Sequence, residues 1–269
     1  MPSGIKRDLS KPNVARVYDY LLGGHESFAA DREQAARLLR ICPSAGMAAF
    51  ENRYFLARAI TWAAGQGLTQ FIDLGSGAPP HKTSARVVED IHVTAQAANS
   101  SARVAYIDND PIVLARSRAF RAPAKGVAVA DADLTDPASV LARPYVRALI
   151  DPAKPVCVVL GLVLSFMPAR QARQVVAGYA GLIAPGSCVV ISCGRSDDEA
   201  LWKQLSEAYT AADVYNHSPS EVESFLCGLE PVPPGIAAAQ SWRGGWHDVP
   251  MTPRAPAYAL SAVARKPGG

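Results

Sequence analysis

The sequence predicts an α/β protein with a Rossmann-like, mostly parallel, doubly wound sheet of seven strands behind a helical N-terminal cap. Three observations predict this fold. An apolar strand candidate at residues 69–74 leads into a turn with two glycines. Further strand candidates then alternate with helical segments, as a doubly wound sheet requires. Residues 12–65, in contrast, show helical periodicity.

The helical block at the N-terminus is expected to contain three helices. Apolar residues recur at helical spacing until Gly23 and Gly24 interrupt the pattern. Pro43 and Gly65 follow the second and third helices. The expected helices span residues 14–22, 29–41 and 44–64. We expect residues 1–66 to form a cap within the same globular unit as the core, residues 67–269.

The turn after the first expected strand suits a ligand that approaches the backbone closely. Residues 71–74 suit a buried strand, and Gly75 and Gly77 follow. A dinucleotide site would need a third glycine, G-x-G-x-x-G. Here Pro79 and Pro80 remove amide donors and displace the helix start, which weakens a phosphate site. A nucleoside ligand without phosphates, such as S-adenosylmethionine, stays compatible, and a nicotinamide oxidoreductase is the least favoured alternative.

Carboxylates accompany the ends of three successive strand candidates. Asp73 lies in the first, and Asp108 and Asp133 follow those expected over residues 103–107 and 126–130. The carboxyl ends of parallel strands share one edge of the sheet, where ligands bind. A ribose diol needs a bidentate acceptor and an adenine amine needs a single one. Asp108 and Asp133 are candidates for these contacts.

Aspartate is also a common helix cap and turn residue, and this role is expected for two others. Asp110 precedes Pro111, which opens a helix through Arg118, and Asp136 precedes another proline.

The rest of the chain continues the alternation and closes with an antiparallel edge. Strands are expected over residues 156–160, 187–193, 229–236 and 258–264, helices over 168–184, 198–212 and 218–226, and a loop over 244–256.

Composition narrows the function further. The chain has 269 residues, 49% of them hydrophobic, and a formal net charge of +3 without a basic cluster. An obligatory nucleic-acid partner is therefore not expected. The five cysteines are scattered without C-x-x-C, and the five histidines lack metal-ligand spacing. We expect reduced thiols, no metal site, no membrane segment and a cytoplasmic location. The oligomeric state stays open, a homodimer included.

The motifs together resemble class I S-adenosylmethionine-dependent methyltransferases. More narrowly, the chain is similar to an actinobacterial family that begins with Y-D-Y-L-L-G-G, here residues 18–24. Matching segments follow in order over nearly the whole chain: Asn52-Arg53-Tyr54-Phe55-Leu56, the glycine turn, Tyr106-Ile107-Asp108-Asn109-Asp110-Pro111, Ala132-Asp133-Leu134 and residues 262–267.

This resemblance implies the role of each candidate residue toward S-adenosylmethionine. It implies that Gly75, Ser76 and Gly77 wrap the methionine end through backbone amides, that Asp73 meets the amino group directly or through water, and that Asp108 takes the ribose hydroxyls. Around the adenine it implies Asn109, Asp133 and Leu134. Arg53 would pair the methionine carboxylate or be a surface arginine. Tyr18, Gly24 and His25 would form a flap over the sulfonium or an amphipathic helix with a glycine cap. Gly161, after the fourth strand, completes the expected cofactor set.

Two departures from the family pattern leave the reaction open. Thirty-one positions separate Gly77 from Asp108, because residues 80–91 form a longer segment, and Ser165 replaces a histidine. We expect a methyltransferase acting on a small molecule of secondary metabolism, with S-adenosylhomocysteine as product and no identified catalytic residue. The alternatives are a cofactor pocket used for a cyclisation or rearrangement, and a non-catalytic ligand-binding protein.

Overall fold

The computed structural model describes residues 9–80, 89–244 and 256–268, and its centre is an eight-stranded sheet of order β3-β2-β1-β4-β5-β8-β6, with β7 also paired to β8. The strands are β1 (Gln70–Leu74), β2 (Arg103–Asp108), β3 (Val127–Asp131), β4 (Cys157–Gly161), β5 (Cys188–Ser196), β6 (Glu230–Pro231), β7 (Ala237–Ala238) and β8 (Ala257–Arg265). The first five pair in parallel, and β8 runs antiparallel to β5, β6 and β7. The predicted fold class is confirmed, with eight strands in the sheet instead of the expected seven.

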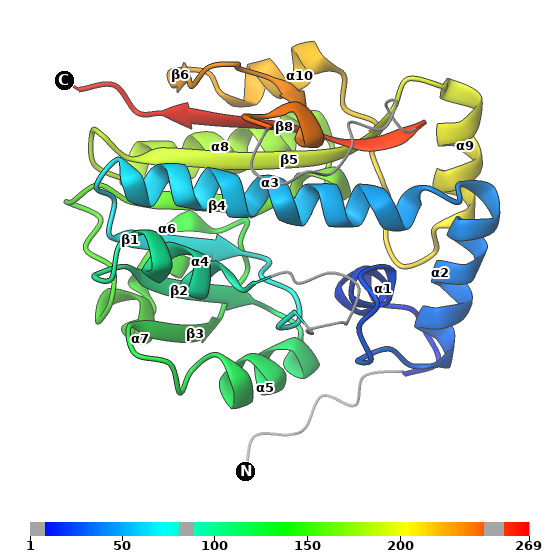
Figure 1. Cartoon of the computed structure of the whole chain (residues 1–269), viewed down its shortest axis with the longest axis horizontal. Coiled ribbons are helices and arrows are strands. Elements are labelled where there is room, and N and C mark those ends of the chain that lie inside the picture. The colour runs from blue at the N-terminus through cyan, green and yellow to red at the C-terminus, as the bar shows by residue number, and fades with distance from the viewer. Residues whose placement is uncertain (1–8, 81–88, 245–255, 269) are drawn as a thin grey trace.

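Helices cover both faces of this sheet. They are α1 (Val14–Leu21), α2 (Ala29–Ile41), α3 (Ala45–Gly65), α4 (Ile91–Ala98), α5 (Pro111–Phe120), α6 (Pro137–Ala142), α7 (Pro144–Arg147), α8 (Ala169–Leu182), α9 (Glu199–Ala208) and α10 (Pro219–Phe225), with short 3-10 turns η1 (Val163–Phe166) and η2 (Ala239–Ser241). In Figure 1, α3 crosses one face and α8 lies behind the other. None of the helices in the described ranges is long and apolar enough to cross a bilayer.

Strand alternation divides the core between the two faces. Ile72 and Leu74 pack with α8 and α10 on one side, whereas Phe71 packs with Phe55 and Ile60 of α3 on the other. All of these side chains are buried. Burial on both faces explains why the parallel strands read as nearly continuous apolar runs.

The strand register brings the expected carboxylates to one edge. Asp73 is paired with Tyr106, so Asp108 lies two positions further along the neighbouring strand. Asp108 is itself paired with Asp131 at the end of β3. This edge faces α1 and α2 (Figure 1).

Polar contacts join the cap helices to one another and to the core. The Arg16 guanidinium and the Asp31 carboxylate form a buried ion pair of 2.7 Å between α1 and α2. Asn13 caps α1 and donates from Nδ2 to Asp110 Oδ2 at 2.8 Å. On the far side, Gln34 of α2 accepts from the backbone of Thr210, just after α9, at 3.0 Å.

The element boundaries agree with expectation in the first two thirds of the chain and differ near the end. The helix expected over residues 29–41 is α2, and Asp110 and Asp136 cap helices as expected. The strand expected over residues 229–236 is wrong. Within this range only β6 pairs, and β7 begins just beyond it, because Pro233 and Pro234 lack the amide hydrogens that a ladder needs.

Two other boundary differences concern the C-terminal third. The helix expected over 198–212 ends at Ala208, since Gln34 takes the Thr210 amide. Within the loop expected over 244–256, residues 245–255 lie outside the described residues, as do residues 81–88 of the long segment.

Candidate functional site

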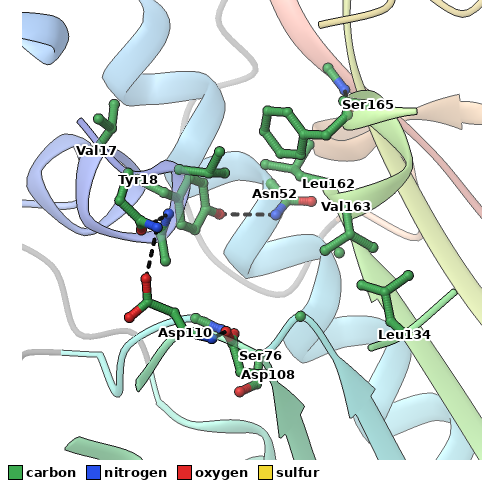
Figure 2. A pocket seen from close by; sticks show the side chains of 18 of the residues that line it. Val17, Tyr18, Asn52, Ser76, Asp108, Asp110, Leu134, Leu162, Val163 and Ser165 are labelled. Atoms are coloured by element: carbon green, nitrogen blue, oxygen red, sulfur yellow. Dashed lines mark hydrogen bonds between the residues drawn. The ribbon is translucent and has the colours of Figure 1, made fainter. Parts of the chain in front are cut away.

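One cavity of about 510 Å³ opens at the carboxyl ends of the parallel strands, beneath α1. All but two of the thirteen residues expected to bind the cofactor line it: Tyr18, Arg53, Asp73, Gly75, Ser76, Gly77, Asp108, Asn109, Asp133, Leu134 and Gly161. The lining has two parts. The part that we call the polar half consists of Arg53, Asp73, Asp108, Asp110 and Asp133. The part that we call the apolar half consists of Leu21, Phe166, Met167, Trp202, Tyr209 and Val214. Figure 2 shows Asp108 and Asp110 at one end and Leu162, Val163 and Ser165 toward the other.

The glycine turn has a backbone conformation that favours glycine. Gly75 and Gly77 have φ of +65° and +62°, a region that L-residues with side chains rarely adopt. A Cβ on Gly75 would also lie 2.4 Å from Val163 Cγ1. Glycine at this position therefore lets β1 and η1 approach each other across the cavity.

The amides of this turn are largely engaged within the protein. Ser76 N donates to Ile107 O at 3.0 Å, and Gly77 N donates to Asp108 Oδ2 at 3.0 Å. The expectation that all three turn amides face the methionine end does not fit this arrangement. Two of the three amides instead form hydrogen bonds that connect the turn after β1 to the end of β2.

Asp108 organises the turn as much as it faces the cavity. Its Oδ1 accepts from the amides of Asn109 and Asp110, both at 2.9 Å, while Oδ2 accepts from Gly77. Burial raises the pKa of Asp108, and the Asp110 and Gly77 amides act against that rise. A carboxylate offers about four acceptor positions. Three of them are filled here, which leaves room for one ligand hydroxyl rather than two.

Arg121, which the motif reading missed, supports the glycine turn from below. Its side chain is fully buried and forms a bidentate pair with Asp90, Nε to Oδ2 at 2.7 Å and NH2 to Oδ1 at 3.0 Å. Its NH1 donates to Gly77 O at 2.8 Å and to Ser76 Oγ at 3.2 Å. The guanidinium also lies 4.1 Å from the centre of the Tyr106 ring, a cation–π contact.

Asp90 and Arg121 form an ion pair beneath the cavity in which both side chains stay ionised. Burial acts to raise the pKa of Asp90, but the charge and hydrogen bonds of Arg121, together with the charges of Arg53 and His92, outweigh it, and this pKa lies below its usual range. Asp90 also caps α4. One buried pair therefore ties α4, the end of α5 and the glycine turn together.

Asp73 and Arg53 present opposite charges to the cavity without partners of their own. Both are at least nine-tenths buried, and in the described part of the chain neither side chain forms a hydrogen bond or ion pair. Burial raises the pKa of Asp73 to about 7, while the charges of Arg121 and Arg53 lower it. A buried, poorly solvated carboxylate beside an unpaired guanidinium suits a zwitterion that brings an ammonium and a carboxylate.

Asp133 and Leu134 contribute the third strand end. Asp133 is exposed, and its Oδ1 accepts from the Thr135 amide at 2.9 Å and from Thr135 Oγ1 at 2.8 Å. The Tyr179 hydroxyl donates to Leu134 O at 3.0 Å, which fixes the loop against α8. Both residues line the cavity, beyond Asp108 along the sheet edge.

The flap residues divide into one that lines the cavity and two that do not. The Tyr18 hydroxyl accepts from Asn52 Nδ2 at 2.9 Å (Figure 2). It donates to Ala49 O at 3.1 Å. Gly24 lines a small adjoining cavity, and a Cβ there would lie 2.2 Å from Asp19 Oδ1. His25 is exposed and lines neither cavity.

A second polar chain that sequence reasoning missed connects the cap to β4 and β5. Leu162 N donates to Ser192 Oγ at 3.0 Å, and Ser192 Oγ donates to Asn52 Oδ1 at 2.6 Å. Leu162 has φ of +62°, a strained value for a branched residue, and it lines the cavity beside Gly161. The only sequence signal for Asn52 was its place in the resembling segment beside Arg53.

Comparisons with known proteins identify what the chain is similar to. A family model described as S-adenosyl methyltransferase matches residues 3–267. A protein from Thermobifida fusca YX, provisionally described as a methyltransferase, is 33% identical with a TM-score of 0.88 over 97% of both chains. A DUF574 family protein from Streptomyces avermitilis MA-4680 is 31% identical with a TM-score of 0.88, over 97% of this chain and 99% of that one.

More distant structures share the fold alone. The magnesium protoporphyrin IX methyltransferase of Synechocystis PCC 6803, solved with SAH bound, is 11% identical with a TM-score of 0.53 over 93% of both chains. Among curated proteins, none matches.

Proposed function

We propose that this chain, which belongs to the S-adenosyl methyltransferase family, methylates a small molecule of secondary metabolism. Family membership makes it a methyltransferase that depends on S-adenosylmethionine, and the resemblance found in the sequence is confirmed. The observation that carries the proposal is the unpaired Asp73 and Arg53 in a cavity that continues into an apolar space. A single cavity can then hold the cofactor and a neutral acceptor side by side.

The polar half would hold the cofactor. Asp73 would accept from the ammonium and Arg53 would pair the carboxylate of the methionine part. Asp108 would accept one ribose hydroxyl at its remaining position, and Asp133 would accept from the adenine amine. When bound, the cofactor supplies a methyl carbon on a positively charged sulfur, which leaves as a neutral thioether.

The protein's own contribution would be positioning and exclusion of water. The cap, residues 1–66, would close one side of the same globular unit and hold Tyr18 over the cavity. In the described lining, ionisable groups strong enough to act as a base lie in the polar half, while Ser165 lies at the other end. Orientation and desolvation would therefore supply most of the barrier reduction.

Calorimetry and product analysis together test the proposal. S-adenosylmethionine and S-adenosylhomocysteine should each bind one site per chain, and S-adenosylhomocysteine should accumulate when the protein, S-adenosylmethionine and a small-molecule extract are mixed. The absence of binding by either compound would reject a cofactor site. Binding without any release of S-adenosylhomocysteine would instead favour a rearrangement or a non-catalytic role, which no observation on the described residues favours.

A further inference from the structure

The apolar half of the cavity has no charged side chain in its described lining. The five carboxylate and guanidinium groups among the described residues that line the cavity all belong to the polar half. A charged acceptor would lose its hydration in the apolar half without gaining a counter-ion, which is costly. An uncharged acceptor would lose much less.

Aromatic side chains give this half flat walls. The rings of Phe166 and Tyr209 are stacked, with centroids 6.1 Å apart and planes inclined by 23°. Trp202, on α9, lines the same space. Rings of this kind favour a planar ligand, because offset stacking and edge contacts add to the area that is buried.

Backbone contacts hold these walls in place. Tyr215 N donates to Ser165 O at 2.9 Å, and His217 Nε2 lies 3.0 Å from Leu164 O. The segment after α9 is thereby fastened to η1. The space between them is preformed, so a ligand need not order it on binding.

Ser165 supplies a neutral polar group at this end. Its Oγ accepts from Gly194 N at 2.8 Å. Across residues 9–80, 89–244 and 256–268, the Ser165 hydroxyl hydrogen has no acceptor. The side chain is buried and lines the cavity. It can therefore donate to an oxygen or nitrogen of the ligand.

We infer that the methyl acceptor is an uncharged aromatic molecule with a polar substituent, which packs on Phe166, Trp202 and Tyr209 and accepts a hydrogen bond from Ser165. The inference rests on the proposed function, because it places the acceptor beside a bound cofactor. For a phenol, a bond forms between its oxygen and the methyl carbon. The bond between that carbon and sulfur breaks with its electron pair staying on sulfur, and the phenolic proton leaves to water.

Calorimetry on protein saturated with S-adenosylhomocysteine tests the acceptor class. The neutral probes are phenol, indole and 2-naphthol, and the charged probes of matched shape are 2-naphthoate and 2-naphthylmethylammonium. At least one neutral probe should bind about tenfold more tightly than either charged one. If S-adenosylhomocysteine itself does not bind, the proposed function is wrong. Normal binding of S-adenosylhomocysteine with no neutral probe bound, or with charged probes bound equally well, would overturn the inference alone.

A charge placed in the apolar half should reverse this preference. Val214→Lys, in the lining, should weaken neutral probes and tighten 2-naphthoate by about tenfold. Leu182→Lys, at an exposed position on α8 outside the lining, is the matched control and should change neither. The same response in both variants, or none in Val214→Lys while it still binds S-adenosylhomocysteine, would contradict the assigned acceptor space.

Discussion

The two halves of the cavity are built in different ways. In the polar half, each strand end is held by backbone amides or by a buried ion pair, so that Asp108 alone accepts three amide hydrogens. The apolar half is formed by side chains from α1, from η1 and the residue after it, and from α9 and the segment that follows it, and the rings of Phe166 and Tyr209 stack within it. Hydrogen bonds and an ion pair hold the polar half in place, whereas packing between side chains holds the apolar half.

This difference separates what each half can recognise. Hydrogen bonds and charges in a buried site reject a ligand that leaves them unpaired, whereas an apolar wall discriminates weakly between molecules of similar size. The polar half therefore suits one invariant cofactor. Residues of the apolar half can be substituted without disturbing the polar half, provided that the supports of the glycine turn remain.

The largest expected effect comes from removing Arg121, the support of the polar half. Arg121→Met leaves Asp90 charged, buried and unpaired, which should lower the free energy of unfolding by about 3–5 kcal/mol. Binding of S-adenosylhomocysteine should also be lost, because the Gly77 carbonyl loses its donor. Denaturant unfolding and calorimetry measure the two effects.

A double variant separates stability from positioning. Arg121→Met with Asp90→Asn removes the uncompensated charge and should recover most of the stability, but not cofactor binding. Recovery of both would show that the contact between Arg121 and the glycine turn is dispensable, and the proposed division between the halves would fail.

Asp108 should give the next largest effect, confined to the cofactor. In Asp108→Asn, one side-chain oxygen can still accept from Asn109 and Asp110, but the new amide group faces the Gly77 amide with two donors opposed. A lost hydrogen bond of this strength, about 1.5–3 kcal/mol, corresponds to a roughly ten- to hundredfold weaker cofactor. Asp131→Asn, at the exposed end of the neighbouring strand and outside the lining, should bind the cofactor like the wild type. If the two variants bind the cofactor with equal affinity, Asp108 does not contact it.

The smallest effect is a pH dependence that should belong to the polar half alone. With a pKa of about 7, Asp73 is half protonated near neutral pH in the ligand-free protein, and an ammonium must displace that proton. Affinity for S-adenosylhomocysteine should fall by up to about tenfold per pH unit below 7 and level off above it. Asp73→Asn should flatten the profile measured by calorimetry, whereas Asp131→Asn should keep it. A dependence that persists in Asp73→Asn would assign the titration to another group.

The same pKa shift has a definite sign for stability. The pKa of Asp73 in the folded protein lies above its usual value of 3.8, so the folded state binds the proton more tightly. The stabilisation that this tighter proton binding gives the folded state is present below the unfolded pKa of Asp73 and is lost as the pH rises toward 7. Asp73→Asn should therefore raise the free energy of unfolding at about pH 8 more than at about pH 4.

Most of the fold could be predicted because its signals are local. Apolar periodicity indicated α2 and the parallel strands, and Asp110 before Pro111 indicated the start of α5. Prediction failed at residues 229–236, where an apolar pattern favoured a strand but two prolines prevented continuous pairing. The pattern reports burial there, and it does not report whether amide hydrogens are present.

The polar half was also predicted in large part, since Asp73, Gly75, Gly77 and Asp108 all lie at strand ends and in one turn. What was misjudged is the use of the turn amides, which depends on the distance between two strands. Gly24 and His25 were expected at the cavity because they follow Tyr18 at, or just after, the end of the segment that resembles the family. The chain turns away after α1, and only Tyr18 lines the main cavity.

The sequence by itself determined the order of helices and strands and the edge at which the carboxylates gather, because periodicity, capping and turn chemistry act over a few residues. Only the tertiary structure decided that Arg121 lies beneath the glycine turn, that Asn52 meets Ser192 across 140 positions, and that Phe166 stacks on Tyr209. Contacts between distant segments depend on how the elements pack, and no short stretch of sequence encodes that packing.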